Sequence, residues 1–134
     1  MDYALITALQ ESVTKKDLPE LRVGMEIIVF QKIKEGDKSR TQKFEGMIIN
    51  MSGKSPLEKT ITVRHVFQAV GIEKTFPIHS PTVEKIEVVG TFKVRHKNIR
   101  FIRKKTGNAA KFKEIKEVKA KTTKVVKKST RKGA

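Results

Sequence analysis

Residues 25–34 read MEIIVFQKIK, and residues 35–39 continue as EGDKS. The first segment is rich in β-branched and aromatic side chains, which favour a strand, and the second has the polar, glycine-containing composition of a turn. A hairpin that returns through residues 41–51 is therefore predicted. The remaining predicted elements lie before and after this hairpin in the sequence.

Further short strands follow the hairpin. A second turn at residues 52–56 precedes two alternating segments, residues 60–66 and 72–76, and residues 83–89 form another strand after Ser80-Pro81. No helical pattern separates these segments, which argues against βαβ units. The predicted fold class is mainly β, with five or six strands in a compact barrel or sandwich.

An amphipathic helix is predicted before the hairpin. Leu5, Ile6, Leu9 and Val13 recur at the spacing of one helical face, and Lys15-Lys16 lies where a cation suits the helix dipole. Pro19 disfavours helical geometry in the preceding residue and so ends the helix. We assign residues 1–16 to the helix and residues 17–90 to the β-domain.

The basic side chains are concentrated at the C-terminal end. Residues 1–90 carry 13 basic and 12 acidic side chains, whereas residues 91–134 carry 17 and 2. Such a segment repels itself and requires a dense counter-charge, most commonly the phosphate backbone of a nucleic acid. Residues 91–114 contain the apolar Phe92, Val94, Ile99, Phe101 and Ile102, so this extension is expected to dock on the β-domain. Residues 115–134 form a lysine-rich tail that we expect to be disordered in isolation.

Several other classes of protein receive little support. The absence of cysteine excludes disulfides and thiolate zinc sites, and the three histidines lack metal spacing. His79-Ser80 lacks a nucleophile elbow and an orienting acid, and the Gly53-Lys54-Ser55 segment lacks the first glycine of a phosphate-binding loop. No membrane span or leader is apparent. We predict no enzyme, no cofactor and no metal.

The segment GIEKTFPIHSP at residues 71–81 resembles a known family. Together with FEG at residues 44–46, TVR at 62–64, KVR at 93–95 and the segment 103–110, it resembles the bacterial large-subunit ribosomal protein L19 family. The likeness covers residues 1 to about 114. Two departures stand out, Asn50-Met51-Ser52 in place of basic residues and Arg100-Phe101 in place of two tyrosines.

The resemblance implies an SH3-like β-barrel with a short N-terminal helix and a basic C-terminal extension. It also implies a structural role on the cytoplasmic ribosome, with binding to large-subunit rRNA near the small subunit and a share in an intersubunit bridge. The implied partners are large-subunit rRNA, small-subunit rRNA across the interface and neighbouring large-subunit proteins.

The candidate RNA-binding side chains are mostly in the extension. Eight basic side chains, His96 included, lie between residues 93 and 105 without an acid, and their mixture of arginine forks and lysine point charges suits phosphate contacts. The predicted rRNA-binding residues are Lys93, Arg95, His96, Lys97, Arg100, Arg103, Lys104, Lys105, Lys111, Lys113, Arg40, Lys43, Arg64, Lys74 and His79. A solvated charged face is the alternative.

Other positions have a structural interpretation beside the functional one. Gly46 and Gly71 indicate strand bulges or bends, or else a close approach of RNA backbone. His79 belongs to a structural turn or contacts RNA. For the whole chain, a histone-like or nucleoid-type DNA-binding protein is the alternative, and a peptide-binding SH3-type module is weakened by the absence of tryptophan.

Overall fold

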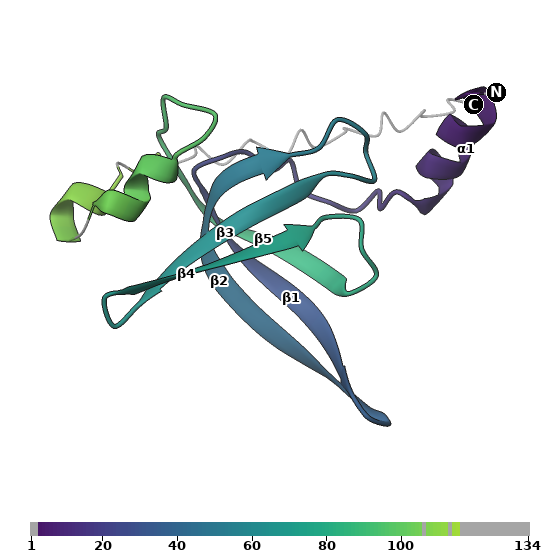
Figure 1. The fold of residues 1–134 in the computed structure, drawn as a ribbon, viewed down its shortest axis with the longest axis horizontal. Coiled ribbons are helices and arrows are strands. Elements are labelled where there is room, and N and C mark those ends of the chain that lie inside the picture. The colour runs from purple at the N-terminus through teal and green to yellow at the C-terminus, as the bar shows by residue number, and fades with distance from the viewer. Residues whose placement is uncertain (1–2, 106, 113, 116–134) are drawn as a thin grey trace, which may run out of the picture.

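The structure is a computed structural model that describes residues 3–105, 107–112 and 114–115. Six strands form one antiparallel sheet in the order β4-β3-β2-β1-β5-β6 (Figure 1). The elements are α1 (Tyr3–Val13), β1 (Met25–Glu35), β2 (Lys38–Ser52), β3 (Thr60–Phe67), β4 (Val70–Pro77), β5 (Val83–Phe92), the 3-10 helices η1 (Arg100–Lys104) and η2 (Gly107–Ala110), and β6 (Glu114–Ile115). The mainly β fold class is confirmed.

The predicted hairpin is formed by β1 and β2. Its ladder runs from Glu35 opposite Lys38 at the turn to Glu26 opposite Met47 at the base. Along β1 alternate side chains are buried, beginning with Met25, and β1 also pairs with β5 on its other side. The distal half of the hairpin has exposed side chains and extends beyond the rest of the sheet (Figure 1).

The sheet curls around one main core. Phe76 of β4 and Ile86 of β5, although far apart in the strand order, belong to the same buried cluster. Its buried members are Met25, Ile27, Val29, Ile48, Ile61, Val63, Phe76, Ile78, Val83 and Ile86. Burial of these aliphatic side chains supplies the main driving force for folding this domain.

A closed barrel is not confirmed. The described ladders end at β4 on one side and at β6 on the other, so the sheet stays open in its backbone pairing. Two further backbone bonds extend ladders between neighbouring strands, from the Ile78 N–H to the Lys59 carbonyl beyond β3–β4 and from the Lys32 N–H to the Thr82 carbonyl beyond β1–β5. Because β4 and β5 share one core while their backbones do not pair, the fold is a strongly curled, open antiparallel sheet.

The predicted N-terminal helix is present as α1, but its apolar face is not covered by the sheet. Leu5 and Leu9 are 65% and 67% exposed, and no residue of α1 is buried. Figure 1 shows α1 standing away from the strands. Neither α1 nor η1 or η2, the helices of the described residues, is long and apolar enough to span a membrane.

Candidate nucleic-acid interface

The basic extension is docked on β2 by two isoleucines. Ile99 is fully buried and Ile102 is 8% exposed, and both pack with Ile49 in a second apolar cluster. The Ile99 N–H donates to the Ile49 carbonyl at 3.0 Å. In the structure these two residues pack against β2, whereas Phe101 remains 40% exposed.

The cations of the extension point away from this apolar contact. Ile99 and Ile102 face β2, so the residues between and around them are left on the outer side of the segment. The predicted residues that are exposed here are Lys93, Arg95, His96, Lys97, Arg100, Arg103, Lys104, Lys105 and Lys111. Lys113, also predicted, lies outside the described residues.

Aromatic side chains lie among these cations. Phe101 makes edge contacts with His96 and Phe112, with ring centroids 6.4 and 6.3 Å apart. The Lys105 ammonium lies 5.0 Å from the centre of the Phe101 ring, within the range of a cation–π interaction. The outer face of the extension thus combines positive charge with a partly exposed ring, which are the two features that bind unpaired nucleotides.

Glu73 of β4 holds the extension against the β3–β4 hairpin. Arg103 donates to both carboxylate oxygens, from Nε to Oε1 at 2.7 Å and from Nη2 to Oε2 at 2.5 Å, and Arg64 Nη1 donates to Oε1 at 2.9 Å. These contacts, those of Arg103 first, lower the pKa of Glu73 although partial burial opposes the shift, and Glu73 raises the pKa of Arg103. We call these three residues the Glu73 node.

Glu73 is not among the residues predicted from the sequence to bind RNA. Its pairing with Arg64 could have been found from the hairpin register, because the two residues are directly opposite in the β3–β4 ladder. Its pairing with Arg103 joins residues 30 positions apart and depends on the docking of the extension. Both arginines were predicted to bind rRNA, and the structure places both in ion pairs with an acid of the same chain.

The two strand glycines make room for Arg64. A Cβ at Gly46 would lie 2.5 Å from the Arg64 carbonyl oxygen, and a Cβ at Gly71 would collide with the Arg64 guanidinium. The register shifts lie elsewhere, between Ile48 and Asn50 and at two places in the β1–β5 ladder. The interpretation of these glycines as bulges is therefore wrong, and close packing within the protein explains both.

The remaining predicted residues are not brought to the extension. Arg40 and Lys43 lie on the distal part of β2, where Arg40 pairs with Glu35 at 2.7 Å and Lys43 covers the Phe30 ring. Figure 1 shows this hairpin end on the opposite side of the molecule from η1 and η2. Lys74 lies over the Phe44 and Phe76 rings at 5.4 and 5.9 Å, where it covers the edge of the core.

His79 anchors the segment that follows α1. Its Nδ1 accepts the Lys15 N–H at 3.2 Å, and the Lys15 ammonium donates to the carbonyls of Ser80 and Val83. Burial, followed by the charges of Lys59 and Lys15, lowers the pKa of His79. A structural turn is thus well supported, and rRNA contact by His79 stays a prediction. Within the described part of the chain, no three His, Asp or Glu side chains gather as metal ligands would.

Comparison with known proteins places this architecture in a family. A family model described as Ribosomal protein L19 matches residues 4–115. The chain belongs to that family. It is 43% identical over 116 residues to the large ribosomal subunit protein bL19 of Malacoplasma penetrans, which covers 87% of this chain and 79% of the relative. It is also 43% identical over 109 residues to the bL19 protein of Synechococcus sp., covering 81% and 86%.

The L19 match confirms the resemblance seen in the sequence. These relatives are ribosomal proteins of the large subunit and not enzymes. The matched segment contains α1 except its first residue, the whole sheet, and the docked extension with η1 and η2. The lysine-rich tail, which we predicted from residue 115 onward, lies outside the described residues except for Ile115.

Proposed function

We propose that this L19-family chain is a structural constituent of the large ribosomal subunit and binds its rRNA through the extension. The observation that carries the proposal is the orientation of that segment. Ile99 and Ile102 are buried against β2, while Arg95, Arg100 and Lys104 beside them are exposed. An apolar side that binds the protein and a cationic side that faces outward suit a segment that tracks a phosphate backbone.

Docking of the extension lowers the cost of binding. A cationic segment that is free in solution loses conformational entropy when it is ordered on RNA. Here the Ile99–Ile49 backbone bond and the Glu73 node already fix residues 99–104 in the free protein. The phosphates at a junction of RNA helices repel one another. The fixed cations of the extension neutralise part of this charge and so stabilise the junction.

The distal hairpin forms a second cationic surface. We infer from it a role at the interface between the two subunits of the cytoplasmic ribosome. The distal hairpin, residues 31–43, carries five basic and two acidic side chains, among them Arg40 and Lys43. Because this hairpin projects from the opposite side of the molecule to η1 and η2, one chain can contact two separate RNA surfaces (Figure 1). We assign the extension to large-subunit rRNA and the distal hairpin to small-subunit rRNA in an intersubunit bridge.

The SH3-like barrel is retained as a proposal for the architecture. Its support is the single core to which β4 and β5 both contribute, although they are far apart in the strand order. The proposal requires that β4 and β5 approach each other in the assembled ribosome as the two edges of a small barrel do.

Co-sedimentation tests the function directly. We expect the protein to co-sediment with large subunits at moderate salt and to leave them only at high salt. In solution it should bind a junction-containing RNA more tightly than duplex DNA at equal salt, because the accessible surfaces of A-form RNA and B-form DNA differ. Tighter binding to duplex DNA would favour the nucleoid-type alternative.

A further inference from the structure

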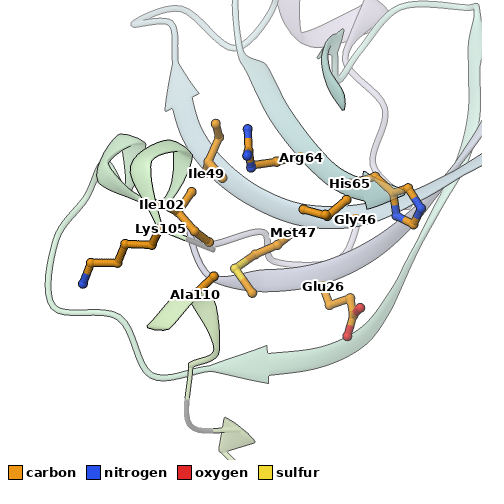
Figure 2. Close-up of a pocket in the computed structure, with 10 residues that line it drawn as sticks. Glu26, Gly46, Met47, Ile49, Arg64, His65, Ile102, Lys105 and Ala110 are labelled. Carbon is orange, nitrogen blue, oxygen red and sulfur yellow. The ribbon is translucent and has the colours of Figure 1, made fainter. Parts of the chain in front are cut away.

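A cavity of about 300 Å³ lies where the extension meets β2 and β3. Its floor is apolar and comes from both partners, with Met47 and Ile49 from β2, Ile102 from η1 and Ala110 from η2. Figure 2 shows Met47 and Ile102 near each other with Ala110 beside them. The cavity therefore exists only while the extension is docked, and the Glu73 node helps to maintain it.

The rim of the cavity is polar. Arg64, His65 and Glu26 line it, and the Lys105 side chain also borders it, although its ammonium points outward in Figure 2. Arg64 is held in place by its bond to Glu73, which uses one of the five N–H donors of a guanidinium. Donors of this kind suit a phosphate, and the planar guanidinium and imidazole groups also stack on bases.

We propose that this cavity binds one unpaired nucleotide of RNA, with the base on the floor of Met47, Ile49 and Ile102 and the phosphate at Arg64. The inference rests on the proposed rRNA binding and names a site within it. Three observations support it: an apolar floor of limited volume, a guanidinium at the rim, and continuity with the exposed cations of the extension. A duplex cannot enter a space of this size, whereas single bases that leave a helix are the usual targets of specific RNA recognition.

The test uses the full chain and two RNA hairpins that differ by a single bulged nucleotide, which is 2-aminopurine. We expect wild-type protein to bind the bulged hairpin about tenfold more tightly than the fully paired one, since one base face is removed from water. The fluorescence of 2-aminopurine should rise on binding, because the base leaves the stack. Ala110→Leu, which fills the cavity with an aliphatic side chain and changes no charge, should abolish the preference and leave affinity for the paired hairpin nearly unchanged.

Two further variants make the result independent of a folding defect. Met47→Leu keeps an apolar floor of similar volume and should retain the preference. Ala110→Met fills the cavity with a different side chain that has no ring and should abolish it, and melting curves establish that each variant is folded. Equal wild-type affinity for the two hairpins, or a preference that persists in both filled variants, would overturn the site and leave rRNA binding standing. Absence of binding to both hairpins and to large-subunit rRNA would overturn the proposed function itself.

Discussion

Glu73 is the residue that most directly joins the extension to the sheet. Its side chain is 22% exposed, and the Arg64 and Arg103 side chains are 15% and 48% exposed, so the node is partly shielded from water. We predict that Glu73→Gln lowers the free energy of unfolding by about 1 kcal/mol, because two partly shielded charge-assisted pairs lose their negative partner. Amide exchange in residues 100–104 should accelerate as the extension loosens.

The matched control is Glu87→Gln. Glu87 also contacts a cation, Lys85, at 2.6 Å, but both side chains of that pair are well exposed. Exposed pairs contribute little, so this variant should leave denaturant midpoints and amide exchange almost unchanged. Equal effects of the two substitutions would contradict the role assigned to the node.

His79 makes stability depend on pH. Its pKa is lowered in the folded protein from the ordinary value of 6.5, so the unfolded chain binds more protons in the interval below that value. Stability should therefore be full above pH 6.5 and fall as the pH drops toward the folded-state pKa. His79→Asn retains an acceptor near the position of Nδ1 but does not titrate, so it should flatten this dependence. Denaturant midpoints between pH 7.5 and 5.5 provide the measurement.

Glu73 acts in a separate, more acidic range. Its folded pKa lies below the ordinary value of 4.5, so its contribution to stability is present above that pH and is lost as the pH falls further. The two ranges can be distinguished in one titration. A slope between pH 7.5 and 5.5 that is identical in wild type and His79→Asn would refute the assignment of the upper range to His79.

At the scale of elements, α1 and the extension contain similar apolar residues but differ in burial. We predict that replacing Leu5 and Leu9 together by serine changes stability by no more than about 0.5 kcal/mol, since both are exposed in the free protein. Ile99→Ala should instead cost about 2–3 kcal/mol, because the side chain is fully buried against Ile49. Thermal melting of the free chain compares the stability of the two variants. A large loss of stability in the serine variant would mean that α1 packs on the sheet in solution.

The distal hairpin should affect subunit association and not folding. Arg40→Ala with Lys43→Ala removes two exposed cations far from the core, so the melting temperature should change little. Large subunits should still incorporate the variant but pair less well with small subunits at low magnesium in sucrose gradients. Gln31→Ala with Gln42→Ala, which changes an adjacent neutral pair, should have no such effect. Normal pairing of subunits in the cation variant would contradict the assignment of this hairpin.

For the whole molecule, rRNA affinity should fall steeply with salt. If the extension neutralises about six phosphates, the slope of log K against log salt should be about −4 to −5. Arg95, Arg100 and Lys104 are better probes than Arg103, which is bound to Glu73. Replacing those three residues by alanine should make the slope shallower by about 2 to 3.

A charge-matched control separates a specific surface from net charge. Lys16, Lys54 and Lys59 are also exposed and lie outside the predicted interface, so their joint replacement by alanine removes the same charge. This control should retain nearly the wild-type slope. Identical slopes for the two triple variants would mean that affinity follows total charge and not the extension.

The sequence by itself determined the strands, the helix and the division between a near-neutral body and a basic extension. These properties depend on local pattern: alternation in β1, the turn at Gly36, the helical spacing in α1, and the excess of lysine and arginine after residue 90. It also contained enough of the L19 pattern to predict the family. The docking of Ile99 and Ile102 was predictable because apolar residues within a cationic segment require an apolar partner.

Only the tertiary structure decided which side chains meet. Curling of the sheet and docking of η1 bring Glu73 to Arg103 across 30 positions, and the turn after β4 brings His79 to Lys15 across 64. The same packing requires glycine at position 46, where a Cβ would meet the Arg64 backbone, and leaves the apolar face of α1 exposed. Periodicity specifies which face of an element is apolar, but the partner of that face depends on the path of the whole chain, so neither the Glu73 node nor the cavity beside it could be read from spacing.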